Sequence, residues 1–165
     1  MTTTGPGHAV IDEYPYDLGE YARPLTTAVA GAGTWVNRGL VWTFGFNHEE
    51  AVECFQRAIE LDPDCALAHW GIAFALGPNY NKPWEFFAPD EATAVLERAR
   101  DEARRAEECA AAATPVEQAL IGALLARYPQ GRAIEECTAW EVDYAVAMEQ
   151  VYAAHGSDLD VACFY

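Results

Sequence analysis

Two histidines and a cysteine are the residues of this chain whose types and spacing could bind a metal ion. Cys65 and His69 lie four residues apart, so on a helix they would share one face and form half of a site. His48 begins the neighbouring helical segment, next to Glu49, and could approach His69. A closed site needs four ligands, however, and the chain has no recognised spacing such as HExxH. We therefore predict neither a metal nor a cofactor: His69 is expected in the core and His48 in an inter-helix turn.

Residues 77–89 form a second group of candidates, because they combine three prolines with four aromatic residues. Connections within helical arrays usually run about 2–8 residues, and longer ones are often functional. The residues that could bind a ligand here are Asn79, Tyr80, Asn81 and Trp84. The asparagines would fix polar groups of the ligand while the rings cover it. The simpler interpretation, which we favour, is a turn capped by its own asparagines, since asparagine tolerates a left-handed backbone and bonds its own main chain.

Composition and charge exclude several classes of function. Lys and Arg number 10 against 26 Asp and Glu, a formal net charge of −16 that would repel nucleic acids and anionic membrane surfaces. The five cysteines include no CxxC pair, so we expect reduced thiols in a cytoplasmic protein. The N-terminal residues lack a basic region followed by an apolar run, so we expect no signal peptide, and no stretch is long and apolar enough to span a bilayer. No P-loop, GxSxG or GxGxxG motif is present either, and an enzyme is the less favoured interpretation.

The elements that must position these residues are helices. For the segment 48–61, Asn47 is a good N-cap, Glu50 completes a capping box, and Pro63 cannot continue the helix. Small residues such as Gly39 would let this helix and the preceding one approach closely. Apolar periodicity and similar end signals predict the other helices at 33–44, 66–76, 90–112, 114–128 and 133–154, with a last one capped by Ser157.

The first two predicted helices resemble a tetratricopeptide repeat, whose pattern is W-x2-L-G-x2-Y…A-x3-F…P. The positions that carry the resemblance are Trp35, Gly39, Trp42, Ala51, Phe55, Ala58 and Pro63, with Arg38 in place of leucine. The segments 45–51, 65–71, 77–81, 113–121 and 127–129 are similar to a group of larger, poorly characterised bacterial proteins of this family. The resemblance implies an all-α fold, a right-handed superhelix of antiparallel helix pairs, here about three pairs plus a truncated helix.

The predicted array does not extend over the whole chain. Proline and glycine are dense in residues 1–25, so an irregular N-terminal segment is expected there and the array in residues 26–165. A solenoid normally closes with a polar helix, whereas residues 161–165 are apolar. We therefore expect the N-terminal part of a longer array, or an end covered by another chain such as a second copy.

One face of the first helix in each pair lines the concave groove of such arrays. The predicted groove residues are Val36, Leu40, Thr43, Leu67, Trp70 and Phe74. This face is apolar and aromatic, and apart from Asn37 it lacks the Lys, Arg and Asn side chains that would grip a terminal carboxylate. It favours a hydrophobic peptide, a small apolar ligand, or packing by the N-terminal segment, although an aromatic stripe at helical spacing is as often plain core.

The leading prediction is an interaction module that presents an apolar groove to a peptide or partner protein. The alternative is an enzyme, or a small-ligand or metal-binding protein, with a site between residues 77–89 and the groove that uses His48 and His69. A third interpretation is a half-array that docks onto the rest of its own protein. An open groove would favour the first, polar side chains converging in a closed pocket the second, and a covered apolar C-terminal face the third.

Overall fold

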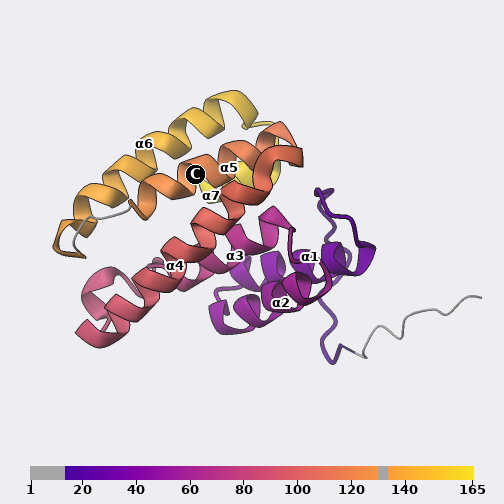
Figure 1. Ribbon diagram of the computed structural model, residues 1–165, viewed down its shortest axis with the longest axis horizontal. Coiled ribbons are helices and arrows are strands. Elements are labelled where there is room, and N and C mark those ends of the chain that lie inside the picture. The colour runs from indigo at the N-terminus through magenta and orange to yellow at the C-terminus, as the bar shows by residue number, and fades with distance from the viewer. Residues whose placement is uncertain (1–13, 130–133) are drawn as a thin grey trace, which may run out of the picture.

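The computed structural model describes residues 14–129 and 134–165, which form seven α-helices and no strand (Figure 1). The helices are α1 (Ala30–Phe44), α2 (His48–Leu61), α3 (Ala66–Leu76), α4 (Pro89–Cys109), α5 (Pro115–Arg127), α6 (Cys137–His155) and α7 (Leu159–Phe164). Short 3-10 helices cover Trp84–Phe86, Ala110–Ala112 and Ile134–Glu136. The predicted all-α class is confirmed.

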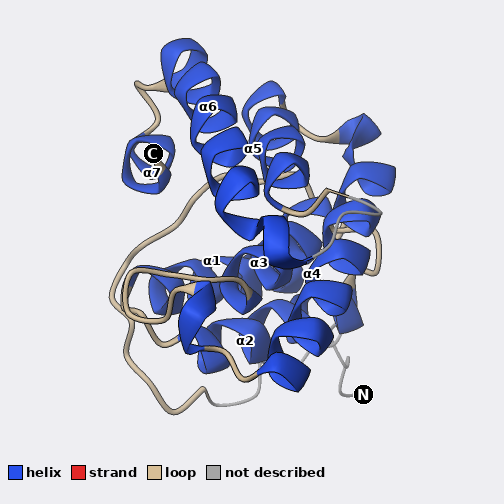
Figure 2. Ribbon diagram, turned by 90° about the vertical axis from the view of Figure 1, so that its left-hand side faces the viewer, coloured by secondary structure: helices blue, strands red, loops and turns tan. Residues whose placement is uncertain are grey.

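Each helix from α1 to α6 packs against the next one, and α3 also packs against both α1 and α5. Figure 2 shows α5 and α6 above α1, α2 and α3, with α4 running up along one side and α7 beside α6. The first helices of successive pairs therefore form one layer and the second helices cover it, as in stacked helix-pair arrays.

Local capping explains where the helices begin and end. Asn47 Oδ1 accepts the Glu50 amide at 3.3 Å, so α2 spans the predicted residues. In α5 the capping box is complete, and Pro115 occupies the first turn, where a missing N–H costs nothing. Asp158, rather than the expected Ser157, caps α7, because its carboxylate accepts the Asp160 and Val161 amides.

The predicted start of the first helix is wrong. Helix α1 begins at Ala30, three residues before the predicted 33, because Asp62 accepts the Ala28 amide at 2.9 Å and holds the entry to the helix. Helix α6 begins at Cys137 after a 3-10 turn, and the predicted start at 133 lies outside the described residues.

The core of the first two pairs is built around the ring of Phe55, which is fully buried. A Cβ added to Gly39 of α1 or to Gly71 of α3 would lie 2.5 Å from this ring. Both helices can approach Phe55 only because these positions carry no side chain. The predicted role of Gly39 in close packing is confirmed.

The described part of the N-terminal segment, residues 14–29, is irregular and packs against the helices. Tyr14 accepts a hydrogen bond from Trp42 Nε1, and Thr27 donates one of 2.6 Å to Asp62. The Tyr14 ring also packs edge-on against Trp35, with the Arg38 guanidinium 4.2 Å from its centroid. This segment is therefore a structural part of the array.

Candidate functional site

Four aromatic rings pack together where α7 covers the α1–α3 layer, and the surface that α1 and α3 contribute to this cluster is called the aromatic groove below. Phe164 of α7 stacks on Phe44 at the end of α1, with ring centroids 5.3 Å apart. It meets Trp70 and Phe74 of α3 edge-on at 5.1 and 5.2 Å. Trp70 and Phe74, one turn apart, stack on each other at 5.1 Å. Edge-to-face and offset pairs of this kind are favourable beyond the area they bury.

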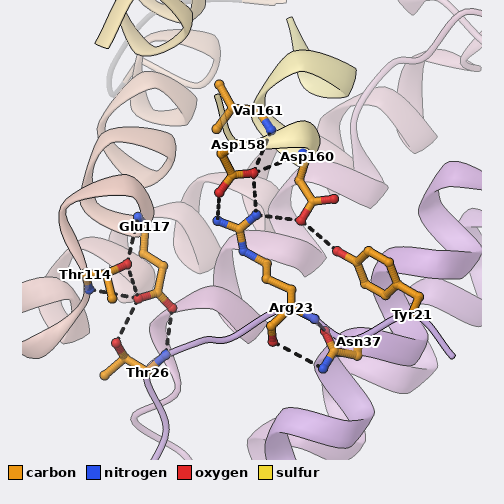
Figure 3. A network of polar contacts seen from close by, with 9 residues as sticks. All are labelled: Tyr21, Arg23, Thr26, Asn37, Thr114, Glu117, Asp158, Asp160 and Val161. Carbon is orange, nitrogen blue, oxygen red and sulfur yellow. Dashed lines mark hydrogen bonds and ion pairs between the residues drawn. The ribbon is translucent and has the colours of Figure 1, made fainter. Parts of the chain in front are cut away.

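A buried arginine binds two aspartates at the start of α7 (Figure 3). Arg23 contacts Asp158 at 3.0 Å through Nη2 and Asp160 at 2.6 Å through Nη1, and its side chain is 6% exposed. Tyr21 donates a 2.8 Å hydrogen bond to the same Asp160 carboxylate. Asn37 of α1 accepts the Arg23 amide at 2.9 Å and so fixes the backbone that carries the guanidinium. The N-terminal segment therefore joins α7 to α1.

The charges of this cluster stabilise one another. Burial lowers the pKa of Arg23, but its bonds to Asp160 and Asp158 outweigh burial and leave that pKa above its usual value. Burial raises the pKa of Asp158, but the bonds from Arg23 and the Val161 amide leave it below its usual value. Burial and the bond to Asp160 both raise the pKa of Tyr21, so its phenol stays protonated. At neutral pH the cluster is a cation between two carboxylates.

Glu117 anchors the same N-terminal segment to α5 and is 1% exposed. Its carboxylate accepts the Thr26 amide at 2.9 Å and the Thr26 hydroxyl at 2.8 Å. It also accepts the amide and hydroxyl of Thr114, at 2.8 and 2.7 Å (Figure 3). Burial raises the pKa of Glu117, yet these bonds outweigh burial and hold that pKa below its usual value. The segment is therefore fixed on both sides of Arg23.

The predicted groove residues fall into two sets. Val36, Leu40, Thr43 and Leu67 are at most 5% exposed and belong to the core between helices. Trp70 is also buried, and its Nε1 donates to Leu120 O at 3.2 Å, while its ring contacts Phe164. The groove surface is therefore narrower than predicted, and its ring contacts run through Phe44, Trp70 and Phe74 to α7.

His69 is a core residue and makes no metal half-site with Cys65. Its Nδ1 lies 2.6 Å from Glu102 of α4 and its Nε2 lies 3.0 Å from Pro63 O, so both ring nitrogens are occupied. Burial raises the pKa of Cys65 to about 11, which leaves the thiol protonated. Among the described residues, no group of three His, Cys, Asp or Glu side chains could hold a metal ion.

The 77–89 connection contains a self-capped turn, as the simpler interpretation predicts. Asn79 Oδ1 accepts the amide of Asn81 at 2.9 Å, and the main chains of Asn79 and Lys82 pair. Asn79 Nδ2 lies 3.1 Å from His48 Nδ1, which ties the turn to the start of α2. Burial lowers the pKa of His48, so its ring is neutral at pH 7.

Two clefts border this turn and separate the predicted loop residues. His48, Asn79 and Asn81 line one of about 920 Å³. Tyr80 and Trp84 line the other, of about 350 Å³, which Asn79 also borders. Tyr80 is 92% exposed, whereas the Trp84 ring is buried. The structure thus brings together His48 and the two asparagines, and His69 is engaged elsewhere.

Sequence reasoning missed the residues that close the groove: Tyr21, Arg23, Glu117, Asp158, Asp160 and Phe164. A signal existed for Arg23, since it is one of only 10 basic residues against 26 acidic ones and lies in an apolar and aromatic segment. Nothing in the local pattern indicates its partners, which lie more than 130 positions away.

Comparison with known families is consistent with this geometry. Residues 47–77, which cover α2 and α3, match the family model of the TPR repeat. This segment is therefore similar to a tetratricopeptide repeat. No curated protein and no solved structure matches it. In the part of the chain that the structure describes, no helix is both long and apolar enough to cross a membrane.

Proposed function

We propose that this chain is a protein-interaction module whose binding surface is the aromatic groove formed by α1 and α3. The single observation that carries the proposal is the seating of Phe164 among Phe44, Trp70 and Phe74. The groove accepts a short helix with an aromatic side chain, which is a recurring way of recognising amphipathic helices. The TPR repeat at residues 47–77 supports the same class of function.

The groove rather than the clefts near residues 77–89 is favoured because of its chemistry. The ring centroids of its three aromatic residues lie 5.1–5.3 Å from the ring centroid of Phe164. Buried aromatic side chains of this kind contribute most of the binding energy in many interfaces. In the clefts, His48 and Asn79 are already engaged with each other. A groove that binds a protein segment therefore accounts for more of the described contacts than a catalytic site does.

The experiment is selection of binding peptides on a groove that has been opened. Phe164→Ala removes the ring that fills the groove, and a phage library of random peptides is panned on this variant. We expect selected peptides to bind Phe164→Ala more tightly than the unmodified chain, because α7 competes in the latter. They should lose binding when Phe74→Ala is added.

Peptides that bind both proteins equally and ignore Phe74→Ala would contradict the proposal. Circular dichroism on each variant checks that the helices remain. Phe86→Ala serves as the matched control, because Phe86 is 70% exposed and lies outside the groove.

A further inference from the structure

We infer that the groove recognises a partner helix that carries two acidic residues and an aromatic residue in the arrangement shown by α7. In α7 these are Asp158 at the N-cap, Asp160 two positions on, and Phe164 four positions further. This inference rests on the proposed function and names the chemistry of the partner. The chain's own α7 then competes with that partner for the groove.

The acidic requirement follows from Arg23. Its guanidinium is buried and bonds two carboxylates, both from the occupant of the groove. A neutral segment that covered Arg23 in place of α7 would bury this cation without a partner, which is costly. An incoming segment must therefore supply carboxylates of its own, and a neutral hydrophobic peptide would bind poorly.

The aromatic requirement follows from the ring cluster. Phe164 contacts three rings at 5.1–5.3 Å, whereas the neighbouring Tyr165 is 57% exposed and stacks on Tyr152 of α6. Val161, one turn before Phe164, is fully buried. The face that enters the groove thus carries an apolar residue and an aromatic residue one turn apart, after the acidic start.

Exchange of α7 is supported by its exposure. Leu159 is 80% exposed, and of the helix only Val161 is buried. Docking of such a segment depends on the Arg23 and Phe164 contacts, and weakly packed segments of this kind open before the rest of a domain.

The test uses the full chain with Phe164→Ala and a fluorescein-labelled peptide of residues 157–165 in which Cys163 is replaced by Ser. Fluorescence anisotropy measures binding. The peptide should bind the variant and bind the unmodified chain much more weakly, because the linked α7 has an effective concentration of about 1 mM. Peptides with Asp158→Asn plus Asp160→Asn, or with Phe164→Ala, should each bind about tenfold to a hundredfold more weakly.

Each other outcome overturns the inference in a distinguishable way. If the Asn peptide binds as well as the parent peptide, the acidic requirement is wrong while the groove function stands. If peptides from the random library bind the groove and the 157–165 peptide does not, the partner chemistry is wrong and the proposed function stands. If neither binds, both fail.

A second copy of the chain is the remaining occupant. If the peptide fails but the unmodified chain binds the Phe164→Ala variant in light scattering, the groove takes a second copy and the inference is wrong. Should Phe164→Ala fail to fold, the chain with Asp158→Asn and Asp160→Asn replaces it, because these changes also release α7. The same peptides and the same outcomes then apply.

Discussion

Glu117→Gln tests whether the N-terminal segment is built into the array through one buried carboxylate. In the native chain Oε2 accepts three hydrogen bonds of 2.7–2.8 Å and Oε1 accepts the Thr26 amide at 2.9 Å. A glutamine can place its oxygen at only one of these positions. Its amino group would then face a donor, which leaves that donor unsatisfied at a site that is 1% exposed.

The expected loss is about 3 kcal/mol. An unsatisfied buried donor costs about 1–3 kcal/mol, and each remaining bond loses the strength that the charge gave it. The contributions share partners, so they do not simply add. With a urea dependence of about 2 kcal/mol per molar, the midpoint of unfolding should fall by about 1.5 M.

The assay is urea unfolding of both proteins, followed by circular dichroism at several pH values. Because the folded pKa of Glu117 is depressed, its ionised form stabilises the fold above the unfolded pKa, and this stability is lost as the pH falls through the folded value. The difference in unfolding midpoint between the two proteins should therefore be largest at pH 7 and shrink below about pH 4. Glu60→Gln, at an exposed side chain that pairs with Arg57, should leave the midpoint unchanged. A difference that is absent at pH 7, or that persists unchanged to pH 3, would refute the reasoning.

Three further changes test the array and its groove. Arg23→Ala should weaken the docking of α7 by about 3 kcal/mol, which is the low end for a broken buried ion pair because both aspartates are partly exposed. Amide hydrogen exchange of residues 159–165 should therefore rise, and unchanged exchange would contradict the role of Arg23. Phe164→Ala should raise binding of the dye ANS, since Trp70 and Phe74 lose their cover, and dye binding equal to that of the native chain would count against a groove under α7. Gly71→Ala should lower Tm by about 6 °C, because its Cβ would meet the Phe55 ring at 2.5 Å, whereas Gly122→Ala meets no atom within 4 Å and should not lower it.

Helices were predictable where the signals are local. The bounds of α2 and α3 agree with the prediction, because Asn47 caps one helix and Pro63 separates the two. The start of α1 was not predictable from the local sequence, because Asp62 fixes the entry to this helix by bonding Ala28, 34 positions away. Local patterns encode caps and breakers, and they carry no information on contacts made after the chain has folded back.

The groove was predictable only in part. Helical spacing identified Trp70 and Phe74, which do contact the occupant. It could not separate them from Val36 and Leu40, which face other helices, since both sets are apolar at the same period. The pairing of Arg23 with Asp160 could not be predicted from the sequence, because the two residues are 137 positions apart and their contact depends on where the array places its last helix.

The most direct test of the groove as a binding surface is hydrogen exchange of the unmodified chain with increasing amounts of the 157–165 peptide. The amides of Ala162 and Tyr165, which bond Asp158 O and Val161 O within α7, report whether this helix is docked. If the groove is a shared surface, added peptide should displace α7 and raise exchange at these amides, while the amides of α1 and α3 stay protected. Exchange that does not change as the peptide saturates its binding would show that the peptide binds elsewhere, and would contradict the account.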